Sequence, residues 1–139
     1  MKANELMIDD WVFIRMNHTT KDYKEGDFIP HRVIGALHPY RRNERWTVDI
    51  VTIESNENQE DFATPIPLTP EILEKNGCTR YGKVYANLQQ WVLKDGDKRK
   101  SFVQDVRTGE WNITDCWINY VHEFQHALKL CKIEKEIEL

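Results

Sequence analysis

Two histidines and a glutamate near the end of the chain have the spacing of a zinc-hydrolase motif. The segment His122-Glu123-Phe124-Gln125-His126 matches the pattern H-E-x-x-H. On a helix, histidines four residues apart share one face and can bind one Zn²⁺, while the adjacent glutamate can act as general base towards a zinc-bound water. Taken alone, the pattern predicts a zinc-dependent hydrolase with His122 and His126 as metal ligands and Glu123 as the catalytic base.

Such a hydrolase needs a third protein ligand, and no established spacing supplies one. The metzincin pattern requires glycine at position 129 and histidine at position 132, where this chain has Lys129 and Lys132. Glu134 would lie about 12 Å from His126 along the same helix, too far to share a metal ion. A chance match to H-E-x-x-H is expected in roughly 2 of 100 chains of this composition. The upstream alternatives for a third ligand are a carboxylate or one of His18, His31, His38 and Cys116.

A helical wheel further weakens the hydrolase hypothesis. At about 100° per residue, Val121, Phe124 and Leu128 form an apolar stripe, and His122 and His126 project from nearly the opposite side. The two histidines are therefore predicted to face solvent or to make structural hydrogen bonds. Glu123 is predicted to be exposed, without a buried partner, and to contribute little to stability. We expect no catalytic residue, no bound metal and no cofactor, with the zinc hydrolase kept as an alternative.

Two groups of basic residues suggest a second activity, nucleic-acid binding. One group lies beside Tyr40 and Trp46, and the other flanks a predicted turn at Asp95-Gly96. Cations interleaved with aromatic rings are typical of single-stranded nucleic-acid surfaces, whereas charged loops also keep β proteins soluble. A protein partner is the other interpretation of such a surface. The candidate binding residues are Arg41, Arg42, Arg45, Lys98, Arg99 and Lys100, with Lys94 next to the second group.

Composition limits the function classes. The chain has 139 residues and a net charge of -4, with 19 Lys and Arg against 23 Asp and Glu. This balance argues against a surface built as a whole for nucleic acid or anionic lipid. Cys78, Cys116 and Cys131 are widely spaced and predict reduced thiols. The chain has no secretory signal and no apolar run of membrane-spanning length, so we expect a cytoplasmic protein with no membrane partner.

The first half of the chain has the pattern of an antiparallel β unit. Strands are predicted at residues 11–16, 31–37 and 46–53, where branched and aromatic residues recur. The polar stretches 17–27 and 54–61 are predicted surface loops, and 40–44 separates the second and third strands. We expect a unit at residues 1–64 that could close into a small barrel, followed by an α+β unit at 65–139, both within a single compact domain.

The second half of the chain is predicted to be a sheet covered by a helix. Thr69, Pro70 and Gly77 have the order of N-cap, first helical residue and left-handed C-terminal residue, which predicts a short helix at 70–76. The segments 83–93, 101–106 and 111–118, separated by Asp95-Gly96 and Thr108-Gly109, predict a three-stranded antiparallel meander with a type I′ turn at Asp95-Gly96. An amphipathic helix is predicted at 120–137. Within the strands, packing in the core or across the sheet is predicted for Trp91, Trp111 and Trp117.

Three stretches together carry a family resemblance: MKANEL at 1–6, PIPLTPEILEKNG at 65–77 and YVHEFQHAL at 120–128. They resemble a family of small uncharacterised proteins of Bacteroides and related bacteria, often encoded by prophages or other mobile elements. The chain departs from the family at Ile8-Asp9-Asp10, where Ile-Gly-Asn is usual. The family's pattern requires neither Glu123 nor His126, and the resemblance implies no established activity. We therefore expect an α+β protein with a non-catalytic binding or accessory function in a mobile element.

Overall fold

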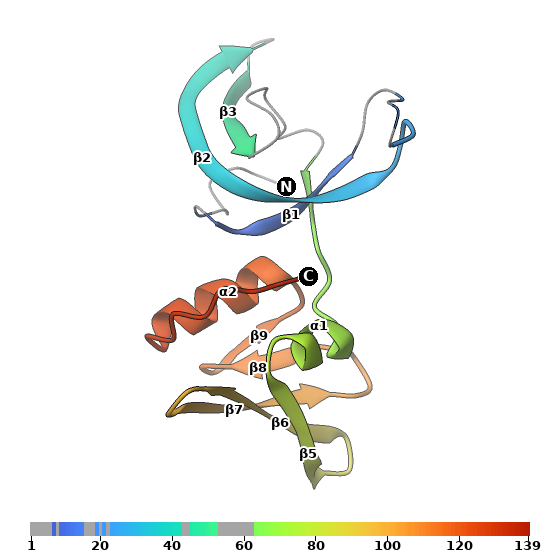
Figure 1. Ribbon diagram of the computed structural model, residues 1–139, viewed down its shortest axis with the longest axis vertical. Coiled ribbons are helices and arrows are strands. Elements are labelled where there is room, and N and C mark those ends of the chain that lie inside the picture. Colours follow the sequence, from blue (N-terminus) through green and yellow to red (C-terminus); the bar gives the residue numbers. More distant parts are fainter. Residues whose placement is uncertain are drawn as a thin grey trace. The chain divides into compact units, whose positions relative to one another are not determined.

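The computed structural model describes residues 7, 9–15, 19, 21, 23–42, 45–52 and 63–139, with the side chains of 34–42, 45–52 and 63 excepted. These residues form an α+β fold with two antiparallel sheets, and the chain divides into an N-terminal unit, Met1–Ile66, and a C-terminal unit, Pro67–Leu139 (Figure 1). In the part of the chain described, neither helix has the length and hydropathy of a membrane-spanning segment.

The N-terminal unit contains a four-stranded antiparallel sheet in the order β3-β2-β1-β4. The three predicted strands are present, and a short fourth strand lies beside β1 at an edge. β2 extends through the stretch at 40–42 that was predicted to be a connection, and its register with β3 shifts between Val33 and Gly35 and again between Ala36 and Pro39. Such irregularities bend a strand, in agreement with the strong curvature of β2 in Figure 1. The strands are β1 (Trp11–Arg15), β2 (Phe28–Arg42), β3 (Arg45–Thr52) and β4 (Ala63–Pro65).

In β1 the side chains alternate between the two faces of the sheet. Val12 and Ile14 are buried, whereas Phe13 is half-buried and Arg15 is exposed. This period of two matches a strand with one face towards a core. Val33 of β2 is also buried, and its N–H donates to the Asp10 carbonyl at 2.9 Å.

The C-terminal unit opens with helix α1 (Pro70–Lys75), and its predicted caps are confirmed. Thr69 Oγ1 accepts a hydrogen bond from the Ile72 N–H at 3.3 Å, and Pro70 occupies the first helical position, where its missing N–H costs nothing. Gly77 follows the helix at φ 84°, in the left-handed region that glycine enters without strain. The sequence therefore determines both ends of α1 locally.

The predicted three-stranded meander is a five-stranded one, in the order β5-β6-β7-β8-β9. A turn at Ala86 and Asn87 divides the first predicted strand, and a turn at Thr114 and Asp115 divides the last. Thr114 and Asp115 have φ 55° and 62°, the positive values of a type I′ turn, which threonine rarely adopts. The strands are β5 (Cys78–Tyr85), β6 (Leu88–Asp95), β7 (Lys98–Asp105), β8 (Trp111–Ile113) and β9 (Cys116–Ile118).

The hairpin between β6 and β7 turns one residue later than predicted. Asp95 pairs with Lys98 across the ladder, so the two central residues are Gly96 and Asp97. Gly96 has φ 61°, whereas the φ of Asp97 is not positive. Glycine at the first central position is the requirement of a type II′ turn, so the prediction of a type I′ turn is wrong.

Helix α2 (Val121–Leu130) ends well before residue 137, the predicted end. After the C-cap residue Cys131, Lys132 adopts φ 58°. The Ile133 N–H donates to the Leu128 carbonyl at 2.9 Å and the Lys132 N–H to the Lys129 carbonyl at 3.0 Å, which is the hydrogen-bond pattern of a Schellman cap. A lysine occupies the position that glycine usually fills, so the sequence carries no signal for this helix end.

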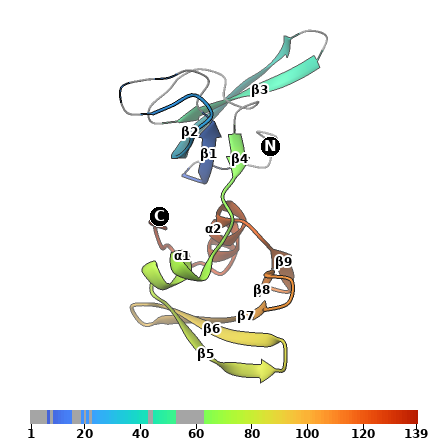
Figure 2. The same cartoon turned by 90° about the vertical axis from the view of Figure 1, so that its right-hand side faces the viewer.

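Both helices lie on one side of the five-stranded sheet, as the two views agree (Figure 2). Trp91, Phe102 and Trp111 are buried on that side of the sheet, and the Phe102 ring contacts Phe124 of α2 with ring centroids 6.0 Å apart. The Trp91 and Trp111 rings meet edge to face at 5.4 Å. Burial is thus confirmed for two of the three tryptophans predicted to pack. Trp117 is 48% exposed and lies opposite Asn112 across the ladder, so of the two predicted placements, in the core or across the sheet, only the second fits this residue.

Candidate functional site

The H-E-x-x-H segment occupies the first half of α2. His122 is only 6% exposed and His126 is half-buried, so solvent exposure, one of the two predicted settings for these histidines, is wrong for His122. The His122 ring stacks on Tyr120 at 6.0 Å with an interplanar angle of 8°, and the His126 ring meets it edge to face at 5.7 Å. The wheel missed this burial because it considers only the apolar stripe of the helix.

Glu123 is a helix-capping residue. Its Oε1 accepts hydrogen bonds from the backbone N–H of Asn119 at 3.1 Å and of Tyr120 at 3.2 Å. Both donors lie at the N-terminus of α2, where a carboxylate also interacts favourably with the helix dipole. Glu123 thus has two backbone partners, one exposed and one half-buried, that the sequence did not predict. A carboxylate held in this way satisfies backbone donors, which is the ordinary role of glutamate at the third position of a helix.

The upstream ligand candidates do not complete a metal site in the described part of the chain. Within residues whose side chains are described, no group of three His, Cys, Asp or Glu side chains is arranged to hold a metal ion. Cys116 is exposed on β9 and His31 is buried in the N-terminal unit. His18 and the side chain of His38 lie outside the described residues.

The predicted basic cluster around the β6–β7 hairpin is split between two faces. Cross-strand neighbours share a face, and Lys94 lies opposite Arg99, whereas Asp95 lies opposite Lys98. Lys98 and Lys100 alternate with Arg99 and lie on the side of Phe102, which faces α2. Lys98 Nζ donates to the Lys132 carbonyl at 2.8 Å, so this lysine ties the segment after α2 to the hairpin.

The other predicted basic group lies in the N-terminal unit. Arg41 and Arg42 end β2, Arg45 begins β3, and Arg42 pairs with Arg45 across the ladder. The side chains of these three residues lie outside the described part of the structure. Their role in binding stays a prediction.

The side of the five-stranded sheet opposite α2 is called the open face here. The register places Gln90, Val103, Asn112 and Trp117 in one row across four strands of this face. Lys94 and Arg99 form a second row near the hairpin. Val103, Gln90 and Asn112 are half-buried, whereas Trp117, Lys94 and Arg99 are exposed. The sequence did not predict this surface because the turns at 86–87 and 114–115 lack the glycine that marks a tight hairpin, so the strands on either side of each turn were predicted as one.

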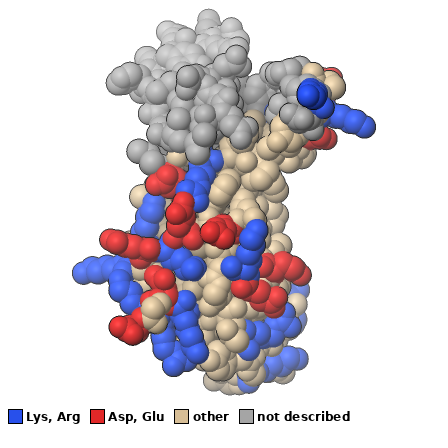
Figure 3. Space-filling model, viewed as in Figure 1, with Lys and Arg blue, Asp and Glu red and all other residues tan. Residues whose placement is uncertain are grey.

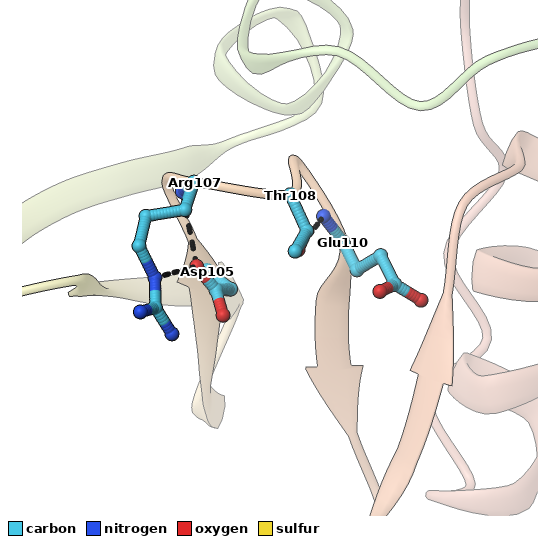
Figure 4. Close-up of polar contacts among 4 residues, drawn as sticks. All are labelled: Asp105, Arg107, Thr108 and Glu110. Carbon is cyan, nitrogen blue, oxygen red and sulfur yellow. Dashed lines mark hydrogen bonds and ion pairs between the residues drawn. The ribbon is translucent and has the colours of Figure 1, made fainter.

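The β7–β8 turn holds an acidic side chain, Asp105, two residues beyond Val103 on the same face of β7 (Figure 4). Asp105 Oδ1 accepts a hydrogen bond from the Arg107 N–H at 2.9 Å and lies 3.5 Å from Arg107 Nε. This backbone hydrogen bond, with the guanidinium beside it, lowers the pKa of the Asp105 carboxyl. Thr108 Oγ1 accepts from the Glu110 N–H at 3.2 Å and closes the turn that leads into β8. Asp105 is thus held ionised at the end of the face away from Lys94 and Arg99.

The C-terminal unit carries side chains of both charges. Figure 3 shows acidic and basic side chains intermingled on the side of the unit that it presents. A nucleophilic role for Cys78 is also unsupported, because burial raises the pKa of its thiol to about 12, with a smaller opposing effect from Lys135.

Comparisons with protein-family models, curated proteins and solved structures find no match to this chain.

Proposed function

We propose that this chain is a non-catalytic binding protein and that the open face of its C-terminal sheet is the binding surface. The observation that carries the proposal is the contrast between the two faces of one sheet. One face packs Trp91, Phe102 and Trp111 beneath the helices. The other presents the half-exposed indole of Trp117 in a row of polar and apolar side chains, a composition typical of binding surfaces.

The hydrolase alternative receives no such support. Glu123, the residue that would act as general base, is hydrogen-bonded to two backbone N–H groups at the start of α2. In this segment Glu123 has a capping role, and His122 and Phe124 are buried on either side of it in the sequence. An accessory role in a mobile element rests on the family resemblance of the three segments, and a cytoplasmic location rests on the free thiols.

The proposal is tested by comparing partner retention between matched variants. The full chain, Trp117→Ala and Leu130→Ala are immobilised and incubated with a bacterial lysate. Leu130 is an exposed apolar residue on α2, outside the open face, so it controls for loss of surface hydrophobicity. The proposal expects a partner that the wild type and Leu130→Ala retain and Trp117→Ala loses. Equal retention of every bound component by the two variants would contradict it.

A further inference from the structure

The positive charge of the open face is concentrated where β6 and β7 approach their hairpin. Lys94 and Arg99 lie directly opposite each other, both are exposed, and neither makes an ion pair or side-chain hydrogen bond with any described residue. On the side facing α2, the neighbouring lysine at 98 has Asp95 across the ladder. Like charges directly opposed destabilise a sheet, and an anion bound between them relieves the repulsion. This pair therefore favours an anionic ligand.

The aromatic part of the same face favours a ligand with flat rings. Trp117 is 48% exposed and lies in the row that contains the amide side chains of Gln90 and Asn112. An exposed indole can stack on a nucleobase of any sequence, and amide groups can donate to and accept from base edges. An acidic peptide would satisfy the cations and leave the indole without a matching group.

The spacing of the two rows requires an extended ligand. Arg99 and Val103 are four residues apart on β7, about 14 Å at roughly 3.4 Å per residue, and Trp117 lies two strands beyond Val103, about 10 Å away. The cationic pair and the indole are therefore separated by about 17 Å. An oligonucleotide can span this distance, whereas a mononucleotide cannot contact both ends.

We propose that the open face binds single-stranded nucleic acid, with Lys94 and Arg99 contacting phosphates and Trp117 stacking on a base. This inference rests on the proposed function and names its partner class. A single strand is favoured over a duplex because stacking on a sheet requires unpaired bases. The carboxylate of Asp105 lies at the far end of the face, where Arg107 holds it, so it does not oppose phosphate binding beside Arg99.

The experiment measures fluorescence anisotropy of a labelled twelve-nucleotide oligothymidylate titrated with the full chain. Each phosphate contact contributes a slope of about -0.7 to the logarithm of affinity against the logarithm of salt concentration. Two contacts then predict an affinity about sevenfold weaker at 200 mM salt than at 50 mM. The double variant Lys94→Gln with Arg99→Gln should lose most of this salt dependence. Trp117→Ala should bind about tenfold more weakly at either salt concentration, since stacking contributes about 1–3 kcal/mol per base.

Two matched controls separate the open face from a general charge effect. Lys100→Gln removes a cation one residue from Arg99 but on the face towards α2, and Leu130→Ala removes an exposed apolar side chain on α2. Both variants should bind within twofold of wild type. Urea unfolding of each variant, followed by circular dichroism, establishes that it is folded before the titration.

Three outcomes would overturn the inference. They are no binding at 50 mM salt, weakening by Lys100→Gln as large as that by the double variant, and wild-type affinity in Trp117→Ala. Displacement of the oligonucleotide by an equal charge concentration of poly-glutamate would also contradict it, because that result indicates a site for any polyanion. A further combination is that the oligonucleotide does not bind while Trp117→Ala still loses a partner from the lysate. That combination would contradict nucleic-acid binding and support the open face as a binding surface for a protein, so the two proposals can be told apart.

Discussion

Asn76 joins the end of the chain to α1, and its replacement gives a quantitative test of the C-terminal unit. The residue is 3% exposed. Its Nδ2 donates to the carbonyls of Ile72 at 2.8 Å and Glu138 at 2.6 Å, and its Oδ1 accepts from the Glu138 N–H at 2.7 Å. Lys75 Nζ adds a hydrogen bond to the Leu139 carbonyl. The side chain of Asn76 therefore acts as a two-sided clamp on the last residues.

Asn76→Ala removes three hydrogen bonds. At about 1 kcal/mol each, the free energy of unfolding should fall by about 3 kcal/mol. Position 76 has φ -102°, which alanine adopts without strain, so backbone conformation adds nothing to this loss. Asn76→Asp should be at least as destabilising at neutral pH, because a carboxylate would face two carbonyl oxygens in place of an amide donor. Urea denaturation followed by tryptophan fluorescence measures both changes.

The hydrogen bonds of Asn76 also predict how fast the Glu138 amide exchanges its hydrogen. Amide hydrogen exchange at Glu138 should accelerate in Asn76→Ala, because its N–H loses the only hydrogen bond that the described residues give it. Asn119→Ala is the matched control, since Asn119 is exposed and its side chain makes no hydrogen bond with described residues; its stability should stay within about 0.5 kcal/mol of wild type. A loss below about 1 kcal/mol in Asn76→Ala, with unchanged exchange at Glu138, would refute the reasoning.

Three further predictions concern single residues of the same unit. Lys132→Gly should stabilise the protein by about 1 kcal/mol, because Lys132 occupies a left-handed position that glycine adopts without a Cβ clash; a loss of stability in urea denaturation would contradict this. Glu123→Ala should cost about 1 kcal/mol and Glu123→Gln under about 0.5, because glutamine keeps the acceptor for both backbone donors; equal losses would contradict the assignment of the stabilisation to these two hydrogen bonds. Burial raises the pKa of Cys78 to about 12, so the folded state favours the neutral thiol: its stability contribution is present below about pH 9 and is lost as pH rises towards 12. Cys78→Ala should therefore flatten the alkaline fall in stability, and at pH 8 a thiol reagent should modify exposed Cys116 well before Cys78; equally fast modification of the two thiols would contradict their assigned environments.

Local signals in the sequence predicted α1 well and α2 less well. Thr69, Pro70 and Gly77 each act within one turn of helix, so propensity and capping suffice to define the ends of α1. The end of α2 depends on Lys132 adopting a left-handed conformation. Lysine does not favour this conformation, and the hydrogen bonds of Lys132 and Ile133 to the last turn of the helix stabilise it. The predicted length of α2 is therefore wrong because contacts beyond the helix, which local sequence preferences do not encode, determine where it ends.

The candidate binding surface could not be derived from the sequence for a related reason. A face of a sheet is defined only once every turn is placed, because a shift of one residue moves each side chain to the other face. The turn at Thr114 and Asp115 lacks the glycine of a typical type I′ hairpin, and without that turn Trp117 is indistinguishable from the buried tryptophans. Alternation along β7 separates Arg99 from Lys98, which adjacency in sequence had placed in one cluster.

The most direct test of the binding surface follows the indole N–H resonances of the five tryptophans during a titration with oligothymidylate. Each indole reports one location, and Trp91 and Trp111 are fully buried on the opposite side of the sheet from Trp117. We predict that the Trp117 resonance shifts in proportion to bound ligand while those of Trp91 and Trp111 stay within the line width. An unchanged Trp117 resonance at saturation, with shifts confined to other tryptophans, would contradict it.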